Sequence, residues 1–488
     1  MTPSPSFSLA PLALAAFMLL PAGANAGQGP GAAAEPDHAI SHRDRVYAAE
    51  QFSNTVSVTD PADGRLLGVI RLGDPAPGNV TPLYRGQLLV HGLGFSPDHR
   101  TIAAISIGSN GVSFIDTATN TVKHTTYVGR SPHEAFFTPD GKQLWVTVRG
   151  ENYIAVLDPA TYQEVSRIVT PGGPGMQIFS PDGKYGYVCS SFNPETIVVD
   201  VASHEIVGHV KQESPFCPNI AATPDGKQVW MTLKDVGRTM VFDARPPFAV
   251  IKSFETGPIT NHVNFARTAR GQFAYVTVGG LNAVKVFRTD GDFGLMATIP
   301  VGAMPHGLWP SGDGSRIYVG LENGDALVAI DTASNKVAGA PIPIGQAPQA
   351  LVYVPEAVPA GDGTQNLQAL GLAGQAAQLT LAGKDSGART NVTLFDQGLV
   401  QVLQASVTGL QPGMSYVLGL SAKADGAGQL QALAAFKANP AGAAIVGVTG
   451  PIRQLTQAAA SDARRYLVIA QQMEGRTGPP VQVQTGAD

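Results

Sequence analysis

The sequence is poor in charge and in cysteine, and both shortages exclude functions. Only 14% of its 488 residues are Asp, Glu, Lys or Arg, and the net charge of −5 offers no basic surface for nucleic acid. The two cysteines form no C-x-x-C-H sequence, which excludes covalent haem of the c type. The 56 glycines and 37 prolines are instead typical of short strands joined by tight turns.

Long apolar runs are also scarce, and the one near the N-terminus has the pattern of a secretory signal peptide. The run from Leu9 to Leu20 is followed by Ala24-Asn25-Ala26, a small-x-small cleavage site. A membrane anchor is the alternative, but the run is short for a span of about 20 residues. We therefore expect a signal peptide over residues 1–26, a flexible leader over 27–44, and a periplasmic or secreted protein with no transmembrane segment in the mature chain.

A repeated turn organises residues 45–355. The Ser/Thr-Pro-Asp turn, or a degraded form of it, returns about every 42 to 45 residues, at Asp98, Asp140, Asp182, Asp225, Arg270-Gly271, Asp313 and Glu356. Each unit holds four short segments with strand patterns, which in one unit are Glu134–Phe137, Leu144–Val148, Ile154–Leu157 and Val165–Val169. The period predicts an all-β fold with a seven-bladed β-propeller.

The two ends of the repeat region predict how the ring closes. The chain begins at Arg45 with the second strand of a blade, and the last segment, Ala350–Val354, has the pattern of the missing first strand. Pairing the two removes the exposed edges that an open ring would leave.

The C-terminal region has a different character, because it contains no repeated turn and no Cys or His. Its segment Leu410-Gln411-Pro412-Gly413, with Tyr416, is similar to the tyrosine corner of immunoglobulin-like and fibronectin type III sandwiches. We expect a linker over residues 356–365 and a smaller immunoglobulin-like β-sandwich domain over 366–488. With no cluster of titratable groups, this domain is predicted to pack or to bind a protein partner.

Four of the ten histidines stand at the start of the innermost strand of a blade. His91, His133 and His306 each precede their turn residue by seven positions, and His262 is displaced by about one. Innermost strands line the channel, so we expect the four imidazoles to converge at one mouth. Imidazole is a common ligand of zinc and copper, and this predicts a transition-metal site that weakens below about pH 6.5. The alternative is that each ring only bonds a neighbouring backbone carbonyl.

Other residues are candidates for the same site. Glu134 could supply a carboxylate, although successive strand residues face opposite sides, and Gln349 occupies the histidine position in the closing blade. Cys189 and Cys217 predict a disulfide, with Cys217 as a soft ligand for Cu(I) as the alternative. The long loop 73–87 is interpreted as a lid over the histidines.

The repeat PHxxxF(S/T)PDGKxxYV, followed by xxVxxID and KVxxxIxVG, resembles that of the YVTN-family β-propellers over residues 45–355. The resemblance implies an exported propeller but no single activity, since similar repeats occur in lactonase-like proteins, streptogramin lyase-like enzymes and metallochaperones. Our hypothesis is metal binding for delivery, sequestration or redox chemistry. The alternatives are a metal-assisted lyase or lactonase-type enzyme with a histidine general base, and a non-catalytic interaction scaffold; which metal or substrate is bound stays open.

Overall fold

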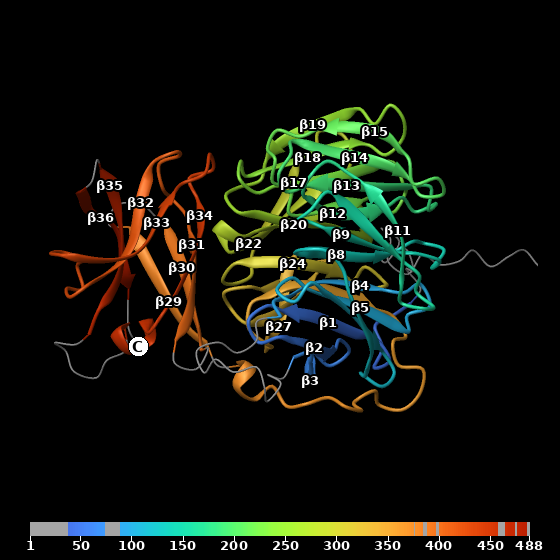
Figure 1. Ribbon diagram of the computed structural model, residues 1–488, viewed down its shortest axis with the longest axis horizontal. Coiled ribbons are helices and arrows are strands. Elements are labelled where there is room, and N and C mark those ends of the chain that lie inside the picture. Colours follow the sequence, from blue (N-terminus) through green and yellow to red (C-terminus); the bar gives the residue numbers. More distant parts are fainter. Residues whose placement is uncertain are drawn as a thin grey trace, which may run out of the picture.

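The computed structural model describes residues 38–73, 88–374, 376–383, 388–396, 400–456, 464–473 and 476–485. The predicted signal peptide, most of the leader and the proposed lid, apart from Gly73, lie outside these ranges. Two all-β parts lie side by side (Figure 1). The described residues include one α-helix, the short α1 (Ile452–Thr456), and no helix long and apolar enough to cross a membrane.

The first part consists of seven four-stranded antiparallel sheets, which confirms the predicted number of blades. Listed from the innermost strand outward, they are β28 (Pro348–Val354), β1 (Arg45–Glu50), β2 (Thr55–Asp60) and β3 (Arg65–Arg71); β4 (Val90–Phe95), β5 (Thr101–Ser106), β6 (Gly111–Asp116) and β7 (Val122–Tyr127); β8 (Pro132–Phe137), β9 (Leu144–Val148), β10 (Tyr153–Leu157) and β11 (Glu164–Val169); β12 (Pro174–Phe179), β13 (Tyr185–Ser190), β14 (Glu195–Asp200) and β15 (Ile206–Lys211); β16 (Ile220–Ala222), β17 (Gln228–Leu233), β18 (Arg238–Asp243) and β19 (Val250–Glu255); β20 (Thr260–Thr268), β21 (Gly271–Val278), β22 (Ala283–Arg288) and β23 (Leu295–Pro300); and β24 (Pro305–Pro310), β25 (Arg316–Leu321), β26 (Ala326–Asp331) and β27 (Lys336–Pro343).

Burial falls from the centre of the ring to its rim. Every residue of β8, β9 and β10 is buried, whereas the outermost β11 alternates between exposed and less exposed residues. The inner strands of each blade are covered by the neighbouring blades on both faces, as for Trp145 and Trp230, whose side chains are fully buried. The outer strand meets solvent, which explains its polar alternation.

The ring closes as the sequence predicts. Strand β28 pairs with β1, with Arg45 opposite Val354 and Tyr47 opposite Val352, so the two ends of the repeat region share one sheet. Glu50, the last residue of β1, adds a polar contact at this seam. Its carboxylate accepts hydrogen bonds from Thr55 Oγ1 at 2.5 Å and from the N–H of Ser57 at 3.2 Å.

The repeated turn is explained by a local hydrogen-bond pattern. Thr138 Oγ1 donates to Asp140 Oδ1 at 2.7 Å, and the N–H of Lys142 donates to the same oxygen at 3.1 Å. The hydroxyl residues of four other turns bond their Asp in the same way, namely Ser96, Ser180, Thr223 and Ser311. Because such bonds compete with strand pairing, they end the innermost strand at an equivalent position in these five blades. We call this end of the propeller the turn face, and the opposite end, where His91, His133 and His306 lie, the histidine face.

The second part consists of a single eight-stranded antiparallel sheet rather than two stacked sheets. Its strand order is β33 (Leu430–Lys437), β32 (Ser415–Ser421), β35 (Tyr466–Met473), β36 (Arg476–Thr485), β29 (Ala376–Gly383), β30 (Arg389–Asp396), β31 (Gln401–Val407) and β34 (Ala444–Gly450). The edge strands β33 and β34 are in contact, so the sheet curls like a barrel around its own core. The expected immunoglobulin-like sandwich is therefore not confirmed, although Tyr416 Oη does accept a hydrogen bond from the N–H of Gln411 at 3.1 Å, as in a tyrosine corner.

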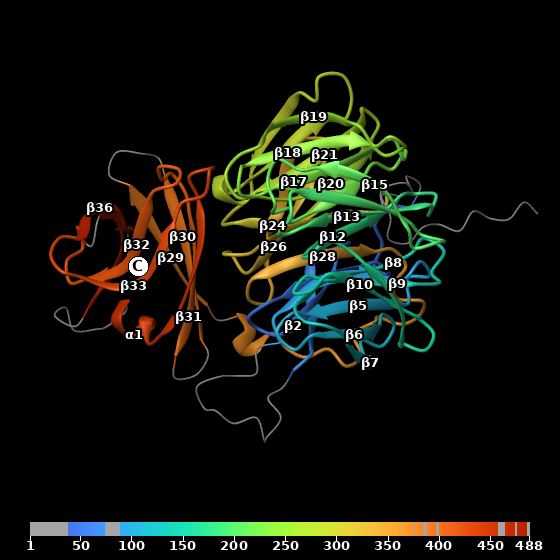
Figure 2. The same ribbon diagram turned by 45° about the horizontal axis from the view of Figure 1, so that its top comes forward.

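The barrel-like sheet is docked on the histidine face (Figures 1 and 2). Asn323, beyond β25, donates to Thr393 Oγ1 at 2.8 Å and accepts from Ser406 Oγ at 2.6 Å. Gln404 Nε2 donates to Glu322 Oε1 at 2.6 Å. Phe52 packs on Phe395, with ring centroids 4.4 Å apart. The second part thus covers the mouth at which the histidines lie.

Candidate functional site

Each histidine-bearing inner strand contains a β-bulge at the histidine. In β8, Pro132 pairs with Val148 and Ala135 with Val146, so that His133 and Glu134 together face Thr147. Strands β4, β20 and β24 leave register in the same way, at His91-Gly92, Asn261-His262 and His306-Gly307. Bulges redirect side chains and are frequent beside functional sites. Here they allow a histidine to leave the regular alternation of the strand.

The bulges explain why the sequence places His262 about one position away from the other three histidines. The first bulge position holds His91, His133, Asn261 and His306, whereas the second holds Gly92, Glu134, His262 and Gly307. The backbone confirms this alignment, because the N–H of Glu134 donates to Thr147 Oγ1 at 3.1 Å and the N–H of His262 donates to Thr277 Oγ1 at 2.8 Å. His262 therefore corresponds to Glu134, not to His133.

The glycines that follow two of the histidines are required by the close approach of neighbouring blades. A Cβ on Gly92 would lie 2.3 Å from the carbonyl oxygen of His133, and one on Gly307 would lie 2.5 Å from that of Gln349. Any other residue would push the inner strands apart. The His-Gly pairs therefore combine a functional side chain with a steric requirement.

A left-handed residue precedes these inner strands, a feature that our sequence analysis missed. Leu89, Ser131 and Met304 have φ of 54°, 50° and 55°, although none is glycine. Asparagines of the preceding blade hold the turns: Asn110 Oδ1 accepts from the N–H of Ser131 at 3.0 Å, and Asn282 Oδ1 accepts from that of Met304 at 2.9 Å. Such strained conformations cluster at functional sites. The recurrent Asn before the third strand of a blade is the signal that could have revealed them.

The four imidazoles form one continuous arc. Ring centroids are 4.4 Å apart for His133 and His91, 6.4 Å for His91 and His306, and 4.7 Å for His306 and His262. The four rings therefore lie next to one another, but His91, His133 and His306 line the cavity above the arc and His262 lines the cavity below it. The four histidines are nevertheless too widely spaced to form a compact metal site as they stand. No three of their ring nitrogens all lie within 4.8 Å of one another, whereas two other groups of side chains in the described residues meet this limit.

Burial and hydrogen bonds keep these rings neutral, the state in which imidazole can bind a metal ion. Burial lowers the pKa of all four, and that of His306 to about 3. His133 Nδ1 lies 3.0 Å from the carbonyl oxygen of Gly175, and His306 Nδ1 lies 2.7 Å from that of Gln349. A neutral ring that donates from Nδ1 presents an unprotonated Nε2, the arrangement typical of metal-bound histidine. Gln349 thus contributes its backbone carbonyl.

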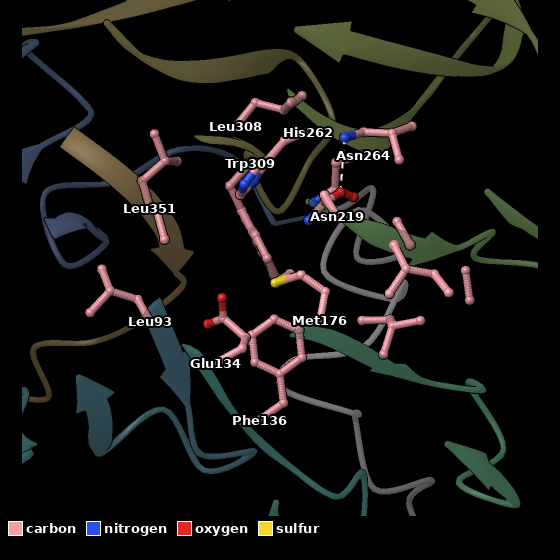
Figure 3. Close-up of a pocket in the computed structure, with 16 residues that line it drawn as sticks. Leu93, Glu134, Phe136, Met176, Asn219, His262, Asn264, Leu308, Trp309 and Leu351 are labelled. Carbon is pink, nitrogen blue, oxygen red and sulfur yellow. Dashed lines mark hydrogen bonds between the residues drawn. The ribbon is translucent and has the colours of Figure 1, made fainter. Parts of the chain in front are cut away.

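Below the arc the channel is narrow (Figure 3). A cavity of about 30 Å³ is lined by His262 and Asn219 on one side and by Glu134, Phe136 and Met176 on the other. Glu134 Oε1 is buried without a hydrogen-bond partner, and burial raises the pKa of this carboxyl well above its ordinary value. The second bulge position therefore points into the channel, so Glu134 lies with His262 rather than with the three other histidines.

Above the arc lies a larger cavity of about 460 Å³, roofed by the second part. His91, His133 and His306 lie at its floor, Arg149, Lys234 and Glu322 at its walls, and Gln404, Lys437 and Asn439 of the barrel-like sheet at its roof. We call it the interdomain cavity. Its volume is in the range typical of small-molecule sites, about 300 to 1,000 Å³.

The two cysteines form the predicted disulfide, with their Sγ atoms 2.13 Å apart. Both side chains are fully buried. The alternative interpretation of Cys217 as a copper ligand is wrong for this oxidised form, because its sulfur is already bonded to Cys189.

Two compact groups of potential metal ligands lie near the turn face instead. They are His38 with Asp44 and Glu356, and His42 with Asp60 and Asp63. In the first group Arg43 Nε also lies 2.9 Å from Glu356, and Tyr353 Oη donates to Asp44 at 2.5 Å. These contacts tie the N-terminal segment to the closing blade, which gives the group a structural role without an ion.

No protein-family model and no curated protein matches this sequence. Its fold is similar to solved structures: hydrazine synthase of Kuenenia stuttgartiensis, with a TM-score of 0.50 and 19% identity over 58% of this chain and 94% of that one, and a functionally unknown protein from Desulfotomaculum acetoxidans, with a TM-score of 0.54 and 15% identity over 64% of this chain and 98% of that one. Identities this low show a common fold alone. The seven-bladed propeller is confirmed, but membership of the YVTN family is not.

Proposed function

We propose that this protein is an exported propeller that binds a transition metal ion, zinc or copper, at the histidine face. His91, His133 and His306 would be the ligands, with His262 next to His306 from below. The observation that carries the proposal is the buried arc of neutral imidazoles in which two Nδ1 atoms already meet backbone carbonyls. The predicted export agrees with the buried disulfide, since disulfides persist in oxidising compartments.

The spacing of the arc requires the rings to move closer when they bind an ion. Zinc–nitrogen bonds are about 2.0 to 2.1 Å long, so two nitrogens bound to the same ion lie less than 4.8 Å apart. No three ring nitrogens of the arc are mutually this close. Three histidines would leave one coordination position open toward the interdomain cavity. A bound ion would supply a Lewis-acidic positive charge at the cavity floor.

The test is calorimetric titration of zinc and of copper into the full chain after treatment with chelator. His133→Ala/His306→Ala should weaken binding by more than the roughly 10- to 100-fold that loss of an outer-shell partner costs, since it removes the ligands themselves. His38→Ala/His42→Ala, which disrupts both groups near the turn face, is the control and should leave this binding event unchanged. Equal binding by the wild type and His133→Ala/His306→Ala would refute the proposal.

Metal-assisted catalysis of the lyase or lactonase type is a second candidate, and the interdomain cavity favours it. An enclosed space beside three histidines could hold a substrate, and one of these three that is not a metal ligand could act as general base. An interaction scaffold is the third candidate. Metal delivery and sequestration need no turnover, so hydrolysis or elimination by metal-loaded protein would favour the enzyme.

A further inference from the structure

The interdomain cavity is lined by three cations, Arg149, Lys234 and Lys437, and by two carboxylates, Glu322 and Asp235, and we infer that it binds a small oxyanion, a carboxylate or a phosphate. Arg149 and Lys234 line its walls, and neither forms an ion pair with a carboxylate anywhere in the described residues. This inference concerns a ligand of the cavity and does not require a metal ion on the histidines.

Arg149 is the stronger anchor. Burial lowers the pKa of its guanidinium, and no nearby carboxylate counteracts that effect. Removing a charge from water without a partner is costly, so a protein that retains such a group gains free energy when an anion binds. The planar guanidinium fork matches the two oxygens of a carboxylate or phosphate. An anion is therefore the ligand whose chemistry suits this wall.

Lys234 lies within electrostatic reach of Arg149. Burial lowers its pKa, as does the positive charge of Arg149, whereas Glu322 and Asp235 raise it. Both carboxylates line the cavity, and Glu322 also accepts a hydrogen bond from Gln404 Nε2. They partly balance the positive charge of Lys234, whereas no carboxylate pairs with Arg149 in the described residues.

The histidines add to this arrangement. Arg149 lowers the pKa of His91 and His133, and Lys234 lowers that of His262 and His306, so each cation faces one half of the arc. An anion between the two cations would lie directly above the imidazoles. If the proposed metal is present, the same anion would reach its open coordination position.

Arg149 also lies between the cavity and the surface. It lines a second, shallower pocket of about 370 Å³ at the surface, together with Arg130, Glu151 and Phe192. Phe192 is 64% exposed there, and Arg130 pairs with Glu151 at 3.7 Å. Arg149 is the residue that the two pockets share, so an anion that entered through the surface pocket would pass it.

The experiment titrates malonate and inorganic phosphate separately into the full chain in the presence of a chelator, with isothermal calorimetry as the readout. Malonamide, the uncharged counterpart of malonate, is the ligand control. We expect saturable binding of at least one anion and none of malonamide. Binding of malonate alone identifies a carboxylate site and binding of phosphate alone a phosphate site. Absence of saturable binding by both anions would overturn the inference.

Variants assign the binding to the cavity. Arg149→Gln and Lys234→Gln should each lower the affinity for the anion at least tenfold. Arg149→Lys should have an intermediate affinity, because it keeps the positive charge but loses the paired N–H donors of the guanidinium. Arg130→Gln, which removes an arginine from the surface pocket only, is the matched control. Arg149→Gln should leave the melting temperature without ligand close to that of the wild type, since the side chain is half-buried and makes no ion pair in the described residues. Unchanged anion affinity in Arg149→Gln, whatever its melting temperature, would refute the site.

The anion titration can be interpreted independently of the metal titration. Because chelator is present throughout, loss of zinc binding in His133→Ala/His306→Ala says nothing against the anion site. Conversely, a chain that binds zinc but neither anion would refute this inference and leave the proposed function intact.

Discussion

Glu50 gives the sharpest test of the physical reasoning, because it lies at the strand pair that closes the ring and its pKa is strongly raised by burial. The side chain is fully buried at the end of β1, and burial raises its pKa to about 8 from an ordinary value of 4.5. Hydrogen bonds from Thr55, Ser57 and Gly345 lower the pKa in turn, but burial has the larger effect. The folded protein thus keeps this carboxyl protonated at pH values where the unfolded chain releases the proton.

The sign and size of the effect follow from linkage. A carboxyl whose folded pKa is raised contributes its full stability below pH 4.5 and loses that contribution as the pH rises toward about 8. Each pH unit within this window changes the free energy of unfolding by about 1.36 kcal/mol. Between pH 5.5 and 7.5 the wild type should therefore lose about 2.7 kcal/mol relative to Glu50→Gln, which cannot titrate.

Urea unfolding at pH 5.5, 6.5 and 7.5 measures this difference. The fluorescence of Trp145, Trp230 and Trp309 reports on the propeller, because all three tryptophans are buried there. Glu205→Gln, at an exposed site, should follow the wild type at every pH. If Glu50→Gln and the wild type respond in parallel to pH, the carboxyl is ionised in the folded state and the reasoning is wrong.

Three further predictions test other parts of the structure. Cys189→Ala/Cys217→Ala should lower the free energy of unfolding by about 3.6 kcal/mol, the loop-closure value for the 28-residue separation. The exported wild type should take up no alkylating reagent before reduction. Two labelled thiols would contradict the disulfide. Zinc affinity should change by less than tenfold between pH 7.5 and 5.5, because burial lowers the pKa of the four histidines and protons compete with zinc only at lower pH. This differs from the weakening near pH 6.5 that we expected from the sequence. Calorimetry at both pH values measures it. Asn323→Ala should cost about 1 to 3 kcal/mol, because Thr393 and Ser406 lose a buried partner. Asn152→Ala, at an exposed site, should cost little in the same urea unfolding assay.

The repeat is the part of the fold that sequence reasoning predicts best. The Thr138–Asp140 turn is made by residues two apart, and its hydroxyl and carboxylate are visible as a motif. Strand segments such as Leu144–Val148 follow from alternation between such turns, and the count of turns gives the number of blades. These features depend on local chemistry, so the predicted blade strands lie close to the observed ones.

Sequence reasoning also brought the histidines together, but it did not resolve their positions. His262 precedes a degraded turn, and only the pairing of β20 with β21 shows that it lies in the second bulge position with Glu134. A shift of one residue changes the direction of a side chain and hence the cavity that it lines. Cross-strand register decides this, and no motif in the inner strand encodes it.

What the tertiary structure alone decided is how the site is enclosed. Asn323 and Glu322 meet Ser406 and Gln404 across more than 80 residues of chain, and these contacts place the barrel-like sheet over the histidine face. The enclosure half-buries Arg149 and Lys234 without giving either an ion pair in the described residues, and burial lowers the pKa of the imidazoles. The sequence determined which residues are present and which turns they form, whereas burial and cross-domain contacts, which depend on distant segments meeting in space, determined their charge state and the cavity that they share.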